Sequence, residues 1–274
     1  MLNKFKAYVK LTRAEHGLLV IVGILIGIII SHGNINPLFF IPPFFVELGA
    51  FALNDYMDYE SDKINKRDRP ITKGDIKKEE ALIVSIVCFF ISLISAFSLN
   101  MGGIIVIITF IILSILYDIY LKKLPLIGNM FIAFSMAIPF IYAGIVVNSL
   151  NDTILYISLS AFFIGLGREI IKTIEDIKGD LKINARTLPI VIGIKSAKYI
   201  AYISFLLFIP FSILAYMSLG FSYISFIMLF VAYLTFIYAL YLFEFKNNAR
   251  ASRKAMFITI TLGLITYLLQ SMGP

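Results

Sequence analysis

Two acidic segments with the same internal spacing stand out in a sequence that is 59% hydrophobic. The first, NDYMDYESDKINKRDRPI, begins at Asn54, and the second, DIKGDLKINARTLPI, begins at Asp176. In each, one Asp follows another at a step of four residues, and a Lys, an Ile-Asn pair, an Arg and a Pro-Ile pair come after them. Carboxylates four residues apart share one face of a helix, where like charges destabilise it by about 0.2–0.5 kcal/mol. The spacing therefore predicts that a positive group binds there.

The candidate ligands in both segments are oxygen atoms, without His or Cys nearby. They belong to Asn54, Asp55, Asp58, Asp62, Asp176 and Asp180. These residues fall at the carboxyl ends of predicted helices, where the helix dipole disfavours negative charge. A set of oxygen ligands suits a hard cation such as Mg²⁺, and Mg²⁺ bound by a few carboxylates leaves positions for a phosphate. The prediction is a Mg²⁺ site that receives a phosphate-bearing ligand.

Basic side chains accompany both acidic segments. They are Lys63, Lys66, Arg67, Arg69, Lys73, Lys122, Lys123, Lys178, Lys182 and Arg186. Each of them alone fits the excess of Lys and Arg in cytoplasmic loops. Taken together around acidic pairs, they predict a wall of positive charge for a phosphate.

The elements that position these acidic and basic side chains are predicted to be membrane-spanning helices. Its mean hydropathy is +0.90, only 15% of its residues are charged, and its long uncharged runs reach the length of about 20 residues that a spanning helix needs. Turn residues divide the two longest runs. We predict an all-α, multi-pass membrane protein whose helices surround a central cavity that opens near the cytoplasmic face. The nine predicted helices cover residues 16–32, 38–58, 81–99, 103–120, 125–148, 153–175, 199–218, 222–243 and 255–272.

All 24 Lys and Arg residues fall on one side of these predicted helices. The positive-inside rule assigns that side to the cytoplasm, so the amino terminus is expected inside and the carboxyl terminus outside the cell membrane. The net charge of +7 then reflects topology and attraction to anionic membrane lipids, and we expect no nucleic-acid partner. No obligatory protein partner is implied.

The two acidic segments lie 118 residues and four predicted helices apart. An even number of crossings returns the chain to the same face in the same sense, which is typical of a parallel repeat. We predict one membrane domain over residues 1–274, with repeat halves of about 1–123 and 124–246 and a final helix over 255–272. The matching loops of the two halves are expected to meet.

The sixth predicted helix carries charge unusually early. Only 15 uncharged residues, 153–167, precede Arg168, fewer than a span requires. Arg168, Glu169 and Lys172 are therefore expected to begin inside the membrane boundary and to face a polar cavity. Because Glu169 and Asp176 are seven residues apart, they share a helix face.

These motifs resemble those of a known family. NDYMDYESD followed by RDRP, and EDIKGD followed by RTLP, resemble the two aspartate-rich motifs of the UbiA superfamily of intramembrane prenyltransferases, over nearly the whole chain. Between them, LYDIYLKKLPLIGN resembles the family's Tyr and Lys segment, with Tyr117 and Lys122 at the matching positions. Where many members have Arg-Pro-x-Asn entering the first helix, this chain has RAEH, which keeps Arg13 and replaces the Asn by His16.

The resemblance implies Mg²⁺-dependent transfer of a prenyl group from its diphosphate to a lipid-like acceptor. The residues implied in catalysis are Asp55, Asp58, Asp62, Asp176, Asp180 and Glu169, where Glu169 or an aspartate takes the acceptor proton. Those implied in binding diphosphate or substrate are Arg13, Arg67, Arg69, Tyr117, Lys122, Arg168, Lys172 and Arg186. The apolar helices would hold the isoprenoid tail and exclude water that quenches a carbocation.

The motifs say less about the chemical identity of the acceptor, because their implied role is to bind the diphosphate of the prenyl donor. The stretch GREIIKTIEDIKGD most resembles the branch that transfers a geranylgeranyl group to the hydroxyl of geranylgeranylglyceryl phosphate, forming an archaeal ether-lipid precursor. An aromatic acceptor such as 4-hydroxybenzoate or a quinone precursor, or a chlorin or haem, stays open. A cation-coupled transporter is the alternative from another class, although transporter sites usually lie near the bilayer midplane.

Overall fold

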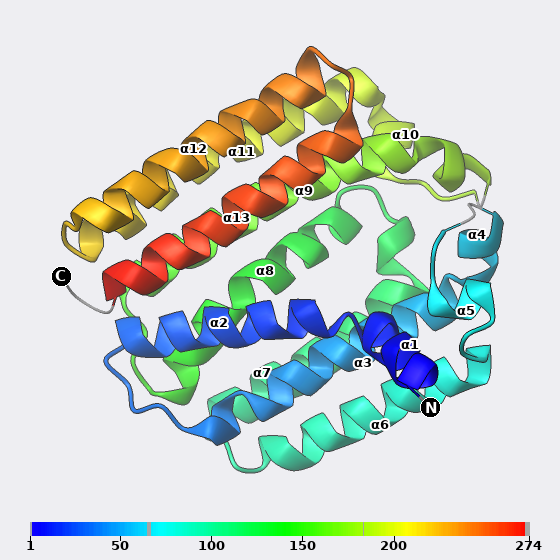
Figure 1. Cartoon of the computed structure of the whole chain (residues 1–274), viewed down its shortest axis with the longest axis horizontal. Helices are drawn as coiled ribbons and strands as arrows, with labels where there is room; N and C mark the ends of the chain where they lie inside the picture. Colours follow the sequence, from blue (N-terminus) through cyan, green and yellow to red (C-terminus); the bar gives the residue numbers. More distant parts are fainter. Residues whose placement is uncertain (1, 65–66, 183, 272–274) are drawn as a thin grey trace. The chain divides into compact units, whose positions relative to one another are not determined.

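The computed structural model of the chain describes residues 2–64, 67–182 and 184–271, and every regular element in these ranges is a helix (Figure 1). Asn65, Lys66 and Ile183, which belong to the sequence pattern above, lie outside the described residues. The all-α fold class is confirmed for the described chain.

Eight described helices are long and apolar enough to cross a membrane. Helices α1 (Leu2–Thr12) and α2 (Ala14–Ile30) meet at a bend of 47° and add a ninth if the pair forms one span. These eight to nine candidate spans agree with the predicted helices. The eight are α3 (Ile41–Met57, preceded by η1, Pro37–Phe39), α6 (Lys78–Ala96), α7 (Met101–Ile119), α8 (Ile127–Val146), α9 (Asp152–Lys182), α11 (Ile194–Ser218), α12 (Tyr223–Glu244) and α13 (Ala249–Ser271).

Four short helices form connections between the long ones. They are α4 (Tyr59–Ile64), α5 (Pro70–Lys73), η2 (Leu121–Lys123) and α10 (Leu188–Ile192). Pro70 and Pro189 lie at the first or second position of α5 and α10, where the missing N–H of proline removes no helical hydrogen bond. The Pro-Ile pairs shared by the two acidic segments therefore start a short helix in each case.

The predicted ends of two helices need correction at the acidic motifs. Helix α9 continues to Lys182, beyond the predicted end at residue 175, so the second motif is helical and not part of a loop. Its Lys, Glu and Leu residues favour helix, and no proline interrupts them. Helix α3 ends at Met57, yet the N–H of Asp58 still bonds to the carbonyl of Asn54 at 2.9 Å, and the N–H of Asp62 bonds to that of Asp58 at 2.7 Å. The four-residue step is thus kept through the end of α3.

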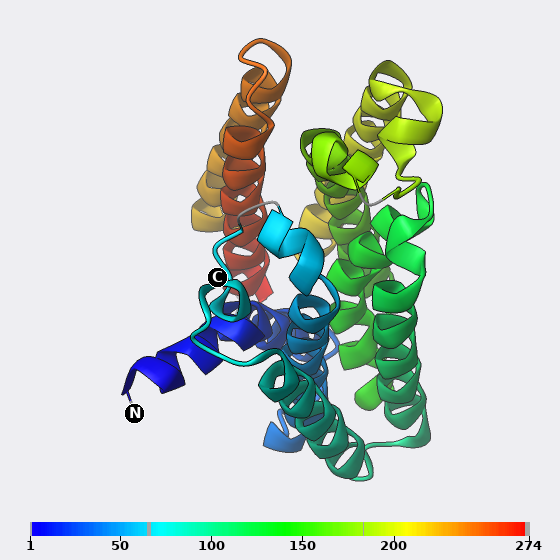
Figure 2. The same cartoon turned by 90° about the vertical axis from the view of Figure 1, so that its right-hand side faces the viewer.

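The chain divides into two compact units, which we describe separately: residues 1–24 with 35–122, and residues 25–34 with 123–274. In the first unit α3 packs against α6 and α7, and α1 lies against α3 and α5 (Figures 1 and 2). Gly49 allows the close approach of α3 to α6, because a Cβ atom there would lie 2.8 Å from the ring of Phe89. The hydroxyl of Ser92 also donates to the carbonyl of Pro42 at 2.9 Å.

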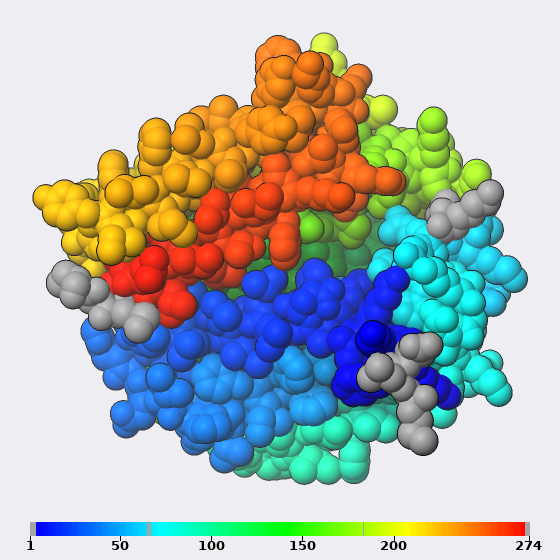
Figure 3. Space-filling view, in the orientation of Figure 1, coloured from blue at the N-terminus to red at the C-terminus, as the bar shows by residue number. Residues whose placement is uncertain are grey.

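In the second unit α9 packs against α8, α10, α11 and α13. Helix α13 runs along α12, and the two lie side by side on the face drawn in Figure 3. The ring of Phe236 packs against Phe205 and Phe208 of α11, each at 5.3 Å between ring centroids. The buried hydroxyl of Ser252 has a backbone partner, because it donates to the carbonyl of Ala239 at 2.7 Å. Packing against α8, α11 and α13 thus fixes the position of α9, whose carboxyl-terminal part carries the second motif.

Candidate active site

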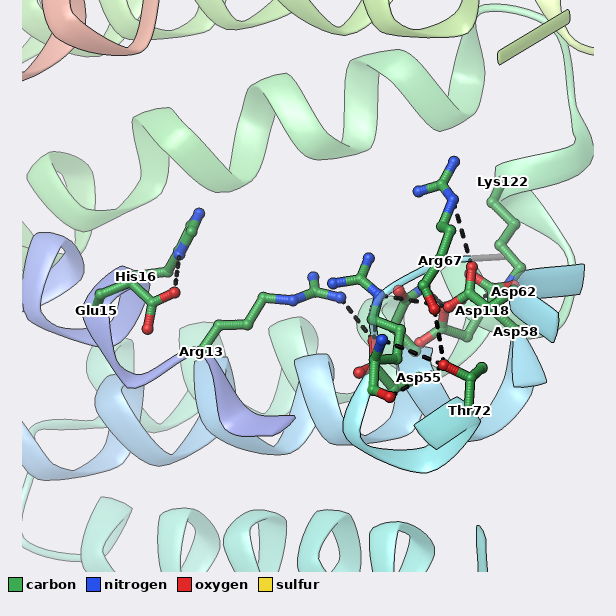
Figure 4. Close-up of polar contacts among 12 residues, drawn as sticks. Arg13, Glu15, His16, Asp55, Asp58, Asp62, Arg67, Thr72, Asp118 and Lys122 are labelled. Carbon is green, nitrogen blue, oxygen red and sulfur yellow. Dashed lines mark hydrogen bonds and ion pairs between the residues drawn. The ribbon is translucent and has the colours of Figure 1, made fainter. Parts of the chain in front are cut away.

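The carboxylates of the first motif meet cations from three separate segments of the first unit (Figure 4). Asn54 and Asp55 lie in the last turn of α3, Asp58 follows that helix, and Asp62 lies on α4. Arg13 comes from the bend between α1 and α2, Arg67 and Arg69 from the connection between α4 and α5, and Lys122 from η2. These eight residues, with Asp118 at the end of α7, are called the first cluster.

Arg13 holds the most deeply buried carboxylate of the motif. Its Nη2 lies 2.6 Å from Oδ1 of Asp55, whose side chain is 1% exposed. The guanidinium also stacks over the ring of Phe51 at 4.4 Å. Arg13 has a φ of 45°, a value that L-residues adopt infrequently, and this conformation forms the bend between α1 and α2. A buried carboxylate requires a partner, and here the partner is the predicted phosphate-binding arginine.

Arg67 and Arg69 close the cluster on the side of α4. The Nε of Arg69 lies 3.4 Å from Asp62 Oδ2 and 3.7 Å from Asp55 Oδ1, and the Nε of Arg67 lies 3.5 Å from Asp62 Oδ1. The Thr72 hydroxyl donates to the carbonyl of Arg67 at 2.7 Å and accepts the N–H of Arg69 at 3.2 Å, which holds the backbone of these two arginines beside α5. Burial raises the pKa of the Asp62 carboxyl, and the charge of Arg69 opposes that effect.

Lys122 joins Asp58 to a further buried carboxylate. Its Nζ lies 2.6 Å from Asp58 Oδ1 and 3.3 Å from Asp118 Oδ1. The same Oδ1 of Asp118 accepts a hydrogen bond from the Asn54 Nδ2 at 2.7 Å. The Asp118 side chain is only 2% exposed. Lys122 therefore lies within ion-pair distance of two acids, one just after the end of α3 and one in the last turn of α7.

The first cluster is balanced in charge, with four carboxylates against four cations. The carboxylates belong to Asp55, Asp58, Asp62 and Asp118, and the cations to Arg13, Arg67, Arg69 and Lys122. In the part of the chain that the structure describes, no three Asp, Glu, His or Cys side chains are grouped to hold a metal ion. The donor set still fits a hard cation, because it consists of oxygen and the buried Oδ2 of Asp55 has no hydrogen-bond partner. Metal binding would require the carboxylates to turn from their present cations.

The second motif lies on one continuous helix in the second unit. Asp176 and Asp180 are half-buried on α9, one turn apart. The Thr187 hydroxyl donates to Asp180 Oδ2 at 3.0 Å, and the N–H of Ala185 donates to the Asp180 carbonyl at 3.0 Å. Arg186 is exposed, and its N–H donates to the carbonyl of Lys123 at 3.3 Å. Ala185 and Thr187 thus both contact Asp180.

Glu169 forms a buried centre two turns earlier on α9. Its Oε1 lies 3.0 Å from the Nη1 of Arg168 and its Oε2 lies 3.0 Å from the Nζ of Lys172. The Glu169 side chain is 6% exposed. The three charges predicted at the membrane boundary therefore neutralise one another in part, within one stretch of helix.

Comparison with known proteins now decides the family. The sequence profile of the UbiA prenyltransferase family matches residues 17–261. The chain belongs to the UbiA prenyltransferase family. Digeranylgeranylglyceryl phosphate synthase of Methanosphaera stadtmanae is 34% identical over 269 residues, which cover 97% of this chain and 98% of the relative. The protein of the same name from Sulfolobus acidocaldarius is 34% identical over 271 residues, with coverage of 97% and 98%.

Solved structures of the UbiA family show the same fold. A structure of digeranylgeranylglyceryl phosphate synthase superposes with a TM-score of 0.77 at 29% identity, covering 99% of each chain. A UbiA homologue from Archaeoglobus fulgidus bound to GPP and Mg²⁺ superposes with a TM-score of 0.68 at 18% identity, covering 97% of this chain and 99% of the other. The chain is accordingly an integral membrane prenyltransferase of the UbiA type.

Within this UbiA chain, sequence reasoning missed Asp118. It had a usable signal, because an acid four residues before Lys122 at the end of an apolar helix is positioned to pair with that lysine. Tyr117, its half-buried neighbour, was singled out instead through the family resemblance. Sequence reasoning also missed Glu175, which pairs with Arg253 at 2.7 Å and Arg250 at 3.3 Å and so ties α13 to α9.

Proposed function

We propose that this UbiA prenyltransferase transfers a geranylgeranyl group from its diphosphate to the hydroxyl of geranylgeranylglyceryl phosphate, in a reaction that depends on Mg²⁺. The observation that carries the proposal is the first cluster, in which Arg13, Arg69 and Lys122 converge on the carboxylates of the first motif. The acceptor is supported by relatives named digeranylgeranylglyceryl phosphate synthase, which match this chain along almost its full length.

The residues that would hold the metal in the first motif are Asn54, Asp55, Asp58 and Asp62. When bound, Mg²⁺ supplies positive charge to the diphosphate oxygens and so stabilises the leaving group. A UbiA homologue of the same fold is bound to GPP and Mg²⁺, which supports this choice of ion and ligand. Asp176 and Asp180 are proposed as further ligands, on the basis of the matching motif.

The cations of the first cluster have two roles in this proposal, one without ligands and one with them. Without ligands, they neutralise carboxylates that would otherwise repel one another in a buried site. Once those carboxylates bind a metal, Arg13, Arg69 and Lys122 are free to turn to the diphosphate, where charge-assisted hydrogen bonds are strong. Arg67 and Tyr117 are proposed for the same ligand. Arg168, Lys172 and Arg186 are proposed contacts for the diphosphate or for the phosphate of the acceptor.

The chemical step forms one ether bond and breaks one phosphate ester bond. The acceptor hydroxyl oxygen bonds to C1 of the prenyl group, and the C1–O bond breaks with its electron pair leaving on the diphosphate. The hydroxyl proton passes to a carboxylate, for which Glu169 and the aspartates of the motifs are the candidates. Arg168 and Lys172 stabilise the ionised form of Glu169, which is the form able to take a proton.

We further propose that the enzyme is one membrane domain with a central cavity open near the cytoplasmic face of the cell membrane. The amino terminus would lie inside and the carboxyl terminus outside. This orientation is supported by the positions of the 24 Lys and Arg residues, which all fall in segments on one side of the predicted helices.

The acceptor is tested by incubating purified full-length protein with geranylgeranyl diphosphate, Mg²⁺ and a panel of acceptors, with products identified by mass. The panel contains geranylgeranylglyceryl phosphate, 4-hydroxybenzoate and a quinone precursor. An ether-lipid product is expected. An aromatic product without ether lipid would overturn the proposed acceptor. Mg²⁺-independent ion flux in proteoliposomes, without diphosphate release from any donor, would favour a transporter.

A lysine pair offers a matched test of donor binding. Lys122→Ala removes the cation beside Asp58 and is expected to raise the KM for the prenyl diphosphate by about 10-fold or more, as loss of a charged hydrogen bond of about 1.5–3 kcal/mol predicts. Lys123→Ala removes an exposed neighbour of equal charge and serves as the control. An unchanged KM in Lys122→Ala contradicts the assignment.

A further inference from the structure

Asp118 is a buried carboxylate that belongs to neither acidic motif. It contacts two residues of the proposed site, Asn54 and Lys122. It occupies the last turn of α7, where the negative end of the helix dipole disfavours an acid. Its side chain is 2% exposed and lies beside Lys122 (Figure 4). One oxygen atom, Oδ1, makes both of its described contacts, with Asn54 and with Lys122. A buried acid at this position needs a specific reason.

The first contact fixes the orientation of the Asn54 amide. A side-chain amide has one donating end and one accepting end, and the hydrogen-bond network decides which way it points. The Nδ2 of Asn54 donates to Asp118 at 2.7 Å, so its Oδ1 is the end that is left for a cation. The reverse orientation would place two oxygen atoms against each other. Asp118 thereby makes Asn54 an oxygen ligand.

The second contact fixes the position of Lys122. The Nζ of this residue lies 3.3 Å from Asp118 and 2.6 Å from Asp58, so its charge is held between two carboxylates. If Asp58 turns to a metal ion, Asp118 still keeps the lysine beside the motif. The ammonium group can then face a diphosphate without leaving the cluster.

We propose that Asp118 is a positioning residue that sets up metal binding through Asn54 and diphosphate binding through Lys122. This inference rests on the proposed function, because it assigns Asn54 to the metal and Lys122 to the diphosphate. Asp118 itself touches neither ligand. Its two roles are separable, since an Asn at this position can still accept the bond from Asn54 but has no charge to hold Lys122.

The test uses purified full-length protein, with Mn²⁺ binding followed by electron paramagnetic resonance and inorganic pyrophosphate binding followed by calorimetry. Asp118→Ala is expected to raise the Kd for Mn²⁺ about 10–100-fold, as loss of a residue that orients a metal ligand does. Saturating metal should restore much of its kcat. Asp118→Asn is expected to keep the Mn²⁺ affinity and to lose affinity for pyrophosphate. Ser114→Ala, at another buried position one turn earlier on α7, is the control and should change neither.

These measurements distinguish a failure of the positioning role from a failure of the proposed function. If the wild-type protein binds both probes and Asp118→Ala binds Mn²⁺ equally well, the positioning role is wrong while the proposed function stands. If Asp118→Ala does not fold, Asp118→Asn decides, and an unchanged pyrophosphate affinity overturns the inference. A wild-type protein that binds neither probe would overturn the proposed function together with it.

Discussion

The two acidic motifs share a sequence pattern but differ in local structure. The first crosses the end of α3, and its carboxylates pair with cations from three distant segments. The second lies on the uninterrupted helix α9, where the hydroxyl of Thr187 bonds to Asp180 and the cations beside Glu169 come from the same helix. Equal spacing therefore does not imply equal surroundings. The first motif depends on tertiary structure for its neutralisation, whereas charges of α9 itself supply much of that neutralisation around Glu169.

The largest effects are expected from removing an aspartate of either motif. Asp58→Ala and Asp176→Ala should each lower kcat at least ~100-fold, which is the usual loss for a group that stabilises charge in the transition state. Both variants should retain their thermal stability in detergent, because both side chains are only half-buried. Product formation from geranylgeranyl diphosphate measures the effect. Full activity in one variant would show that only the other motif serves catalysis.

Thermodynamic stability, unlike activity, should distinguish the two motifs, because only the first contains an ion pair with a fully buried carboxylate. Arg13→Ala leaves the buried Asp55 with only the more distant Arg69, so we expect a loss of about 3 kcal/mol in the free energy of unfolding. Thr187→Val removes one hydrogen bond from the half-buried Asp180 and should lose about 1 kcal/mol. Thermal denaturation in detergent compares the two.

The double variant Arg13→Ala/Asp55→Ala provides the control for that comparison. It removes both members of the ion pair and should be more stable than Arg13→Ala alone, because no buried carboxylate is left without its arginine. A larger loss for Thr187→Val than for Arg13→Ala would contradict the view that the first motif is the one held by distant charges.

The balance of charge in the first cluster predicts that metal and diphosphate bind cooperatively. Either ligand alone adds net charge to a neutral buried site, whereas the two together nearly cancel. Inorganic pyrophosphate should therefore increase the affinity for Mg²⁺ about 5–150-fold, a coupling of about 1–3 kcal/mol. Calorimetry, corrected for the complex that the two form in solution, measures it. Lys122→Ala should weaken the coupling, and equal Mg²⁺ affinities with and without pyrophosphate would contradict it.

The smallest effect is expected at Asp68, an exposed residue that lies between two arginines of the first cluster. Asp68, between Arg67 and Arg69, pairs with Lys73 at 2.8 Å and Lys10 at 2.9 Å, and these hydrogen bonds lower the pKa of its carboxyl to about 2 from 3.8. A lowered folded-state pKa adds stability above the unfolded value, and this stability is lost as pH falls from 3.8 toward 2. Asp68→Asn should therefore lower the melting temperature slightly at neutral pH.

The difference between Asp68→Asn and wild type should disappear near pH 2, and high salt should reduce it at neutral pH because exposed ion pairs are screened. A difference that is independent of pH would indicate that Asp68 acts through packing.

Much of the fold was predictable because long apolar runs and turn residues mark membrane helices directly. The nine predicted helices match the long helices, and the largest errors lie at polar ends such as that of α9, where hydropathy falls although the backbone stays helical. The need of the first motif for positively charged partners was predictable from like charges at helical spacing, and the structure supplies Arg13, Arg69 and Lys122 as those partners. Its actual counterions were only partly predictable, because pairing Arg13 with Asp55 requires knowing that residues 42 apart in sequence are neighbours. Asp118 shows the same limit, since its partner Asn54 lies 64 residues away.

The bend at Arg13 bears on how the protein is made. The residues up to Ile30 leave the ribosome before Asp55 does, so the positive charge at the bend is already present when α3 enters the bilayer. An acid at the centre of an inserting helix disfavours insertion by about 2.5–3.5 kcal/mol, and less toward its end. Because Arg13 precedes Asp55 in the chain, we expect its charge to be available as a counterion while α3 inserts, which would lower the free energy of inserting this acid.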